Sequence, residues 1–384
     1  NVPHLRFPEF SGEWETKSIN DLADVIGGGT PDTTVKSYWD GGIQWFTPSE
    51  IGKNKFVDAS LRTITEDGLN NSSAKLLPPN TILLSSRATI GECSLSLREC
   101  ATNQGFQSLV SKNCNVDFLY YLIQTKKKDL IRKSCGSTFL EISANEVRKI
   151  QVSVPSDVEQ QKIAELLSLI DKRIATQNKI IEKYESLIKG LNNILLYATG
   201  GKSVCLGDIL LERSERSRTN NQHEVLSSTV KGIFSQREYF SKDIASENNV
   251  GYKIIRLHDV VLSPQNLWMG NINYNDRFEI GIVSPSYKVF SIADGYDNQF
   301  VAAMLKTHRA LYSYMMVSEQ GASIVRRNLN MEAFSQLVFK IPSLDKQREI
   351  GCAISLLKSQ LKTANKIIRA YTSQKQYLLC QMFI

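Results

Sequence analysis

The sequence has few of the side chains on which metal sites and disulfide frameworks depend. Four histidines occur in 384 residues, widely separated and without the spacing of metal ligands. The seven cysteines are odd in number and form no Cys-x-x-Cys pair, so we expect reduced, mostly buried thiols. No segment approaches the roughly 18 apolar residues that span a bilayer, and residues 1–6 lack a signal-peptide hydrophobic run. These absences predict a cytoplasmic protein with no metal and no membrane partner.

Motifs for catalysis are also missing. Methyl transfer to adenine or cytosine needs an Asn- or Asp-Pro-Pro-aromatic pocket, but Pro-Pro occurs only within residues 77–80, followed by Asn. Residues 27–29 are three glycines followed by Thr-Pro, which favours a tight turn over a dinucleotide loop. Residues 200–203 imitate the end of a phosphate loop, yet Leu196 occupies its first glycine position. No acidic-x-Lys triplet follows Pro31-Asp32, so the common nuclease motif is absent too. We therefore predict a chain that is not an enzyme and binds no cofactor itself.

Charge and composition favour a polyanion as partner. Lys and Arg exceed Asp and Glu by seven, and the isoelectric point is near 8.9. A hydrophobic content of 42% suffices for packed cores, and the length exceeds that of one ordinary domain. Two or more domains are expected.

The sequence contains a long internal repeat. Residues 155–163, PSDVEQQKI, recur as residues 342–350, PSLDKQREI, and we call the offset between Pro155 and Pro342 the repeat interval. Each copy opens a stretch in which apolar or neutral residues alternate at steps of four and three. The first stretch contains Ile163, Leu167, Ile170, Ile174, Gln177, Ile181, Tyr184, Ile188, Leu191 and Leu195, and the second Ile350, Ile354, Leu357, Leu361, Ala364, Ile368, Tyr371, Lys375, Leu378 and Met382. This heptad-like period is typical of a coiled-coil seam, and two copies predict an antiparallel pair within the chain. The polar Gln177 and Lys375 either fix the register of that pair or face a partner.

The repeat predicts a layout of domain, helix, domain, helix. We expect globular domains at residues 1–155 and 199–342 and long helices at residues 156–198 and 343–384. The two domains also share weaker sequence similarities: residues 82–85 resemble residues 260–263, and residues 118–122 resemble residues 300–305. The predicted fold class is α/β (α+β), with two mixed α/β domains separated by two antiparallel coiled-coil helices in a pseudo-twofold internal repeat. A coiled coil that merely dimerises the protein is the alternative.

Several ordered motifs make the sequence recognisable. Gly-Gly-Thr-Pro at residues 28–31 precedes Tyr-Trp-x-Gly-x-Ile-x-Trp at residues 38–45, and residues 85–91 (SSRATIG) and 103–106 (NQGF) follow. With the paired Pro-x-x-x-x-Gln-x-x-Ile helices, this order resembles the specificity subunit of type I restriction-modification systems over essentially the whole chain. In the second half, residues 226–232, 263–266 and 282–287 resemble the family's other common recognition-domain type.

The resemblance implies a role within a larger complex. Each globular domain would be a target recognition domain for one half of a split double-stranded DNA sequence, and the helices would set the spacer and dock methyltransferase subunits. Two methyltransferase (M) subunits would supply S-adenosylmethionine and modify adenine. Two restriction translocase-nuclease (R) subunits would use ATP and Mg to cleave unmodified DNA. The cofactors therefore belong to the partners.

Residues with hydrogen-bonding or basic side chains in these motifs are candidates for DNA contact. In the first domain they are Trp39 and Trp45 as packing platforms, with Gln44, Thr47, Ser49, Lys53, Ser86, Arg87, Asn103 and Gln104. In the second they are Ser228, Lys231, Gln236, Asn266, Trp268, Asn271, Ser286, Tyr287, Arg326 and Arg327. The alternatives are core packing for the tryptophans and turn capping for the Ser, Asn and Gln residues. A basic run at residues 126–133 either follows phosphates or forms a solvated helix face.

Two other classes of function remain open at this point. One is a single-chain restriction or methylation enzyme, which would transfer methyl groups without added subunits. The other is a coiled-coil scaffold, which would bind proteins but show no sequence-selective DNA binding.

Overall fold

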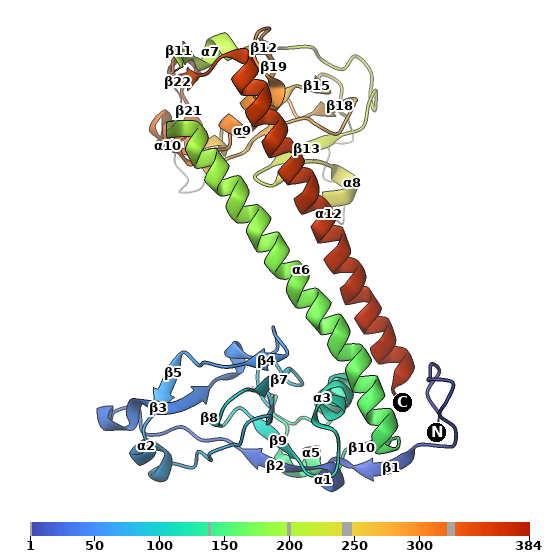
Figure 1. Cartoon of the computed structure of the whole chain (residues 1–384). Coiled ribbons are helices and arrows are strands. Elements are labelled where there is room, and N and C mark those ends of the chain that lie inside the picture. The colour runs from blue at the N-terminus through green and yellow to red at the C-terminus, as the bar shows by residue number, and fades with distance from the viewer. Residues whose placement is uncertain (1, 137–139, 198–200, 240–247, 321–326) are drawn as a thin grey trace. The chain divides into compact units, whose positions relative to one another are not determined.

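The computed structural model describes residues 2–136, 140–197, 201–239, 248–320 and 327–384, which divide into two compact units (Figure 1). The first unit comprises Asn1–Asn178 and Lys366–Ile384, and the second comprises Lys179–Asn365. Two long helices, α6 (Asp157–Tyr197) and α12 (Leu344–Met382), each contribute one part to either unit.

The first unit is built on a five-stranded sheet of order β2-β9-β6-β7-β4. Its centre is β6, whose three residues are all buried, as expected of a short apolar strand in the middle of a sheet. A three-stranded sheet of order β5-β3-β8 and the pair β1-β10 complete the unit. The strands are β1 (Glu15–Ser18), β2 (Ala23–Gly27), β3 (Trp39–Phe46), β4 (Phe56–Val57), β5 (Arg62–Ile64), β6 (Ile82–Leu84), β7 (Cys93–Ser96), β8 (Cys100–Thr102), β9 (Gln107–Ser111) and β10 (Gln151–Val154). The short helices are α1 (Ile19–Leu22), η1 (Lys36–Tyr38), η2 (Pro48–Glu50), α2 (Glu66–Asn70), α3 (Val116–Thr125), α4 (Lys127–Arg132) and α5 (Ala144–Arg148).

The second unit repeats the central topology of the first. Its four-stranded sheet has the order β12-β19-β16-β17, which matches β2-β9-β6-β7 strand for strand. In both units the strand before the long helix pairs antiparallel with the unit's opening strand, β1 with β10 and β11 with β22. The strands are β11 (Lys202–Cys205), β12 (Leu210–Arg213), β13 (Leu226–Thr229), β14 (Gly232–Ser235), β15 (Lys253–Arg256), β16 (Val260–Leu262), β17 (Ile272–Tyr274), β18 (Ile280–Val283), β19 (Lys288–Ile292), β20 (Ser318–Gln320), β21 (Arg327–Leu329) and β22 (Val338–Ile341). The helices are α7 (Leu206–Ile209), α8 (Gln236–Tyr239), η3 (Leu267–Met269), α9 (Asn298–Met304), α10 (His308–Met316) and α11 (Met331–Ser335).

The long helices follow the predicted seam. Along α6 the described seam positions are buried or half-buried, from Leu167 at 0% to Leu191, whereas most residues between them are exposed. Within the first unit α12 runs antiparallel to α6, because Asp171 contacts Lys375 while Arg173 lies beside Tyr371. Two long helices with a heptad-like seam and a repeated mixed fold confirm the predicted fold class.

The glutamine of the repeated motif fastens each long helix to its unit. Gln160 donates a hydrogen bond to the carbonyl of Pro155 (3.0 Å) and accepts one from the backbone N–H of Asn115 (3.0 Å). Gln347 likewise donates a hydrogen bond to the carbonyl of Pro342 (2.9 Å) and accepts one from the backbone N–H of Asp297 (3.0 Å). Asn115 and Asp297 are the N-cap residues of α3 and α9. The motif therefore recurs because both helix starts need a buried side chain that offers one donor and one acceptor.

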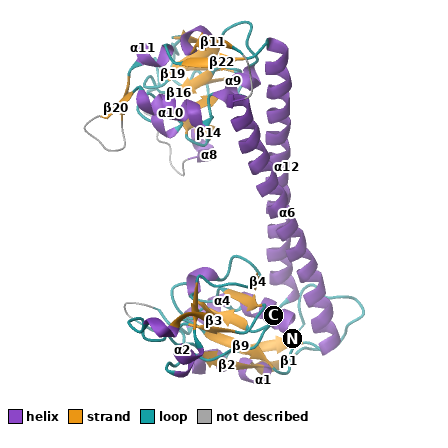
Figure 2. Ribbon diagram, turned by 60° about the vertical axis from the view of Figure 1, so that its left-hand side comes forward, coloured by secondary structure: helices purple, strands orange, loops and turns teal. Residues whose placement is uncertain are grey.

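The C-terminal residues of the chain complete the core of the first unit. Phe383 stacks on Phe118 with ring centroids 5.3 Å apart and meets Trp14 edge-to-face. The backbone N–H of Leu5 donates to the carbonyl of Gln381 (2.9 Å), and both views place the two chain ends close together (Figures 1 and 2).

The three glycines at residues 27–29 do not form the tight turn that we predicted. Their φ angles are not positive, and Gly27 ends β2. A Cβ atom on Gly28 would lie 2.0 Å from the carbonyl oxygen of Asn103, and one on Gly29 would lie 2.3 Å from the backbone nitrogen of Ala74. Glycine is needed here because three backbone segments meet, rather than because the chain reverses. Among the described residues, no helix has the length and hydropathy to cross a membrane.

Candidate nucleic-acid interface

Three loops of the first unit meet at one edge of its sheets. Strands β3 and β8 are parallel, so the loops that follow them begin at the same edge. The backbone N–H of Asn103 donates to the carbonyl of Phe46 (3.1 Å), which joins these two loops. The N–H of Ser86, after β6, donates to the carbonyl of Gly105 (2.8 Å) and brings in the third loop. The structure thus gathers most of the first domain's candidates, which are far apart in the sequence, into one surface.

Some of these candidates are exposed and others serve the loops themselves. Ser49, Lys53 and Gln104 are exposed. Thr47 donates to Glu50 (2.6 Å) in a capping box at η2, and Asn103 accepts from the N–H of Gly105 (2.8 Å). The side-chain oxygen of Gln44 accepts from the backbone N–H of Ser60 (2.7 Å), while Arg87 pairs with Glu141 (2.8 Å). The exposed candidates thus face solvent, and the others bond within the loops that carry them.

Trp39, Trp45 and Ser86 are buried. The two indole rings meet edge-to-face, 5.1 Å apart, and their N–H groups donate to the carbonyls of Asp32 (3.1 Å) and Gly29 (2.9 Å). Ser86 is 0% exposed. The two indoles hold their segments in place, whereas the buried Ser86 hydroxyl has no hydrogen-bond partner among the described residues.

In the second unit, the half-buried Trp268 and Arg327 contact each other. The guanidinium of Arg327 lies 4.7 Å from the Trp268 ring centroid, and its backbone N–H donates to the carbonyl of Gln265 (3.1 Å). Asn266 precedes η3, which carries Trp268. Beside this helix, Lys306 donates to the carbonyl of Gly270 (2.8 Å). Burial, together with nearby Lys358, lowers the pKa of Lys306 to about 8. The sequence analysis missed Lys306, because an isolated lysine gives no signal of its burial.

The other second-domain candidates separate into buried and exposed groups. Ser228 and Asn271 are buried and bonded to each other (2.9 Å), and the hydroxyl of the half-buried Tyr287 donates to the Ser228 carbonyl (3.0 Å). Gln236 donates to Ser227 (3.2 Å). Lys231 and Ser286 are exposed. Arg326 lies outside the described residues.

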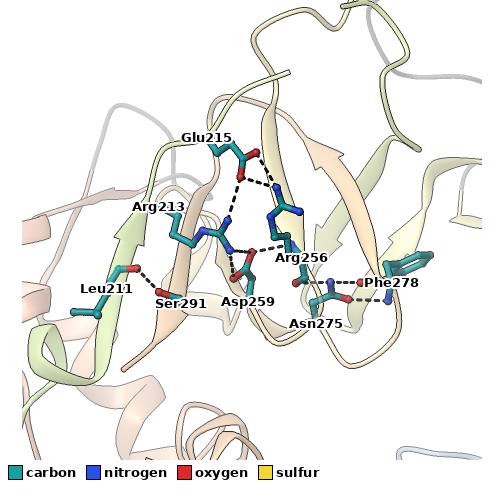
Figure 3. A network of polar contacts seen from close by, with 8 residues as sticks. All are labelled: Leu211, Arg213, Glu215, Arg256, Asp259, Asn275, Phe278 and Ser291. Atoms are coloured by element: carbon teal, nitrogen blue, oxygen red, sulfur yellow. Dashed lines mark hydrogen bonds and ion pairs between the residues drawn. The ribbon is translucent and has the colours of Figure 1, made fainter. Parts of the chain in front are cut away.

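A charged network in the second unit connects β12 and β15 with the residues that precede β16 and follow β17, at the end of the β16-β17 pair opposite η3 (Figure 3). Arg213 contacts Asp259 (3.0 Å) and Glu215 (3.1 Å), and Arg256 reaches Glu215 from the other side (2.9 Å). Asn275 donates to the carbonyls of Arg256 (2.9 Å) and Phe278 (2.7 Å). Because these groups bond one another, the network stabilises the arrangement of the strands that it joins.

The basic run at residues 126–133 is largely paired. Lys127 contacts Glu92, Arg132 contacts Asp129 (2.8 Å), and Lys126 donates to the carbonyl of Ile384 (2.6 Å). These contacts favour a solvated helix face over a phosphate track. In the described part of the chain, no group of three or more His, Cys, Asp or Glu side chains is placed to hold a metal ion.

Comparison with known proteins relates the first half of the chain to one family. Residues 11–186 match the family model described as the type I restriction modification DNA specificity domain. These residues make up slightly less than half of the chain, and over that part the chain is similar to the type I specificity family. The matched residues include most of the first unit and its loop edge.

Two curated relatives are type I specificity subunits. The chain is 40% identical over 179 residues to the MjaIX specificity subunit of Methanocaldococcus jannaschii, covering 44% of this chain and 41% of that one. It is 32% identical over 175 residues to the EcoR124I/EcoR124II specificity subunit of Escherichia coli, covering 44% and 43%. The similarity thus spans about two fifths of the length of these relatives.

A solved type I S subunit from M. genitalium has a similar fold along the whole chain. The TM-score is 0.62 at 16% identity, with 100% of this chain and 99% of that chain covered. At this level of identity the likeness concerns the fold, including the part of the second unit beyond residue 186, where the family match ends.

Proposed function

We propose that this chain is the non-catalytic DNA-specificity subunit of a type I restriction-modification complex, and that each unit reads one half of a bipartite double-stranded DNA target. The observation that carries the proposal is that the central sheet recurs in both units, and that an equivalent glutamine in each bonds the long helix to the N-cap of α3 or α9. Two units with one topology and different surface loops suit two readers of different half-sites.

Each reader would combine base contacts with phosphate contacts. Exposed Gln104 and Ser49 in the first unit offer donors and acceptors to groove edges. Lys53 and Lys231 would supply the salt-dependent phosphate attraction. In the second unit Trp268 and Arg327 form a rigid aromatic and cationic pair beside Asn266.

The long helices would set the spacer between the half-sites. With 41 residues, α6 is about 60 Å long at 1.5 Å per residue. Half-sites one helical turn apart are centred about 34 Å from each other on the duplex. A helix of this length is therefore sufficient to separate two readers.

The same helices carry exposed apolar residues that suit partner docking. Leu169 and Ile367 are 57% and 38% exposed in the first unit, and Leu356 and Ile180 are 60% and 38% exposed in the second. Leu169 corresponds to Leu356, and Ile180 to Ile367, at the repeat interval. We assign this repeated apolar pair to two methyltransferase subunits, because two copies of one partner need two equivalent sites.

The chemistry belongs to these partners in this proposal. The methyltransferase subunits bind S-adenosylmethionine and modify adenine, and two translocase-nuclease subunits use ATP and Mg. The test is long-read detection of modified adenine across a genome that carries this chain and a methyltransferase subunit, compared with a deletion of this chain alone. Loss of one split motif upon deletion is the expected result, and an unchanged pattern would contradict the proposal.

A second assay separates the specificity subunit from a single-chain methylation enzyme. The purified chain, S-adenosylmethionine and target DNA are combined without other subunits. We expect no methyl transfer, and transfer under these conditions would refute the non-catalytic role.

A further inference from the structure

A buried ammonium group connects a recognition loop of the first unit to a long helix. The Lys55 side chain is 7% exposed, and it stands between the loop that carries Ser49 and Lys53 and the edge strand β4. Its Nζ lies 2.7 Å from Asp117 on α3, 2.7 Å from Ser168 on α6 and 3.1 Å from the Tyr121 hydroxyl. Three partners use all three N–H donors of a lysine, so the ammonium is held in one position.

The connection continues from α6 to α12. The Tyr121 hydroxyl donates to one oxygen of Asp171 (2.6 Å), and Lys375 on α12 pairs with the other (2.8 Å). Burial raises the pKa of the fully buried Tyr121, which keeps its hydroxyl protonated and able to donate. Side chains of Asp171 and Lys375 are only 15% and 17% exposed. We call Lys55, Tyr121, Asp171 and Lys375 the clamp.

The clamp spans a hollow rather than a packed interface. A cavity of about 980 Å³ lies between the loop at residues 52–56, α3 and α6, and Lys55, Asp171 and Lys375 line it. Across this hollow, polar contacts join the loop to the helices, whereas Ile163, Leu167 and Ile170 of α6 pack into the apolar core of the unit. Buried ion pairs contribute little net stability, but removing one partner leaves an uncompensated charge, so they favour one geometry over its neighbours.

The second unit does not repeat the clamp. At the repeat interval, Lys358 stands where the first unit has Asp171, and Ile188 stands where it has Lys375. Ala303 corresponds to Tyr121 when α9 is aligned with α3 on Phe300 and Phe118. At the equivalent positions the second unit therefore has neither the carboxylate of Asp171, nor the hydroxyl of Tyr121, nor the ammonium of Lys375. The difference is confined to the clamp, since the hydrogen bonds of Gln160 in the first unit recur at Gln347 in the second.

We propose that the clamp fixes the orientation of the first recognition domain on the paired helices and thereby makes the subunit strict about the length of the DNA spacer. The inference rests on the proposed function. Its four residues are positioning residues: they act through the loop that contacts DNA. A domain free to tilt on the helices accepts half-sites one base pair nearer or farther, whereas a clamped domain does not.

The test is DNA binding by the full chain assembled with its methyltransferase partner. The probes are duplexes with fixed half-sites and a spacer that changes by one base pair at a time. Lys55→Met keeps the apolar stem of the side chain, and Tyr121→Phe keeps the buried ring, so each removes one link of the clamp. We expect the preference for the correct spacer over its neighbours to fall about tenfold, with base preference inside each half-site unchanged.

Matched variants separate positioning from general loss of stability. Tyr314→Phe removes another fully buried hydroxyl, which donates to Leu305 (3.2 Å) in the second unit, and should leave the spacer preference unchanged. Lys375→Arg retains the ion pair and should keep the preference, whereas Lys375→Met should lose it. If Lys55→Met does not fold, the comparison of Lys375→Arg with Lys375→Met tests the inference instead.

Two results would overturn the inference in different ways. Folded clamp variants that weaken binding to every spacer equally, with the preference intact, would show that the clamp is merely structural. An unaltered complex without any half-site preference would instead refute the proposed function on which the inference rests.

Discussion

At the scale of single residues, Gln160 and Gln347 are the side chains whose role is clearest. Both are buried, at 3% and 2% exposure, and each satisfies one backbone carbonyl and one backbone N–H. Neither hydrogen bond is available to an apolar side chain. The motif that first revealed the repeat is thus a structural fastener and not a contact for DNA.

Replacing either glutamine with leucine should destabilise the unit that contains it. Gln160→Leu and Gln347→Leu each leave a buried donor and a buried acceptor without a partner, at a cost of about 2–4 kcal/mol. Denaturant unfolding measures the effect. Gln161→Leu, at an exposed neighbouring position, is the control and should change stability by less than about 0.5 kcal/mol. Equal effects at positions 160 and 161 would contradict the fastening role.

Lys306 should make the stability of the second unit depend on pH in the alkaline range. Its pKa falls from 10.5 in an exposed lysine to about 8 in the folded chain, so the unfolded chain binds the proton more tightly between these values. Stability therefore rises as the pH passes from 8 to 10.5.

The variant Lys306→Met removes this charged, buried group. We expect it to stabilise the chain by about 1–3 kcal/mol at pH 7, with a smaller gain at pH 10. Thermal melting at both pH values measures the difference. A gain that is the same at the two pH values would show that the ammonium is not the cause.

The sequence predicted residue types better than residue roles. Ser49, Lys53 and Gln104 were selected for their chemistry and are exposed, whereas Trp39 and Ser86 were selected in the same way and are buried. Side-chain chemistry is readable from sequence, but burial depends on which loops meet, and residues 46, 86 and 103 meet only in the folded chain. Whether the exposed residues contact bases remains a prediction.

At the scale of elements, the long helices were predictable and the short strands were not. The apolar period continues over ten seam positions in each helix, so a single polar residue such as Gln177 or Lys375 does not prevent its detection. Strands such as β6 and β16 have three residues each, too few to show a period. The polar residue Lys375 was recognised as an interruption of the seam, but its partner Asp171 lies beside the seam and was not.

The repeated exposed residues on the helices should be needed for partner assembly. Leu169→Lys combined with Leu356→Lys places a charge in each proposed docking site and should weaken methyltransferase binding at least about tenfold. Size-exclusion chromatography with light scattering measures the assembly. Thr176→Lys with Thr363→Lys is the matched control, because these exposed threonines also correspond at the repeat interval. Equal loss in both double variants would point to a general charge effect.

At the scale of the whole molecule, the proposal treats the recognition domains as exchangeable parts. Replacing residues 199–342 with another recognition domain should change one half of the methylated motif and leave the other half intact. Methylation mapping in cells reads both halves at once. A change in both halves would contradict independent reading.

The spacer offers a separate test at this scale. One added heptad in each of α6 and α12 lengthens the helices by about 10 Å, which corresponds to about 3 base pairs. We expect the half-sites to move apart by that amount while their sequences stay the same. An unchanged spacer would show that the helices do not act as the ruler.

The completion of the first unit by residues 366–384 has a consequence for biosynthesis. Trp14 and Phe118 leave the ribosome long before Phe383, the ring on which Phe118 stacks. At about 5–20 residues per second, the segment between Phe118 and Phe383 takes roughly 13–53 seconds to translate. During that interval the nascent domain exposes an apolar face, so the order of synthesis makes this unit the last to be finished although it is the first to emerge.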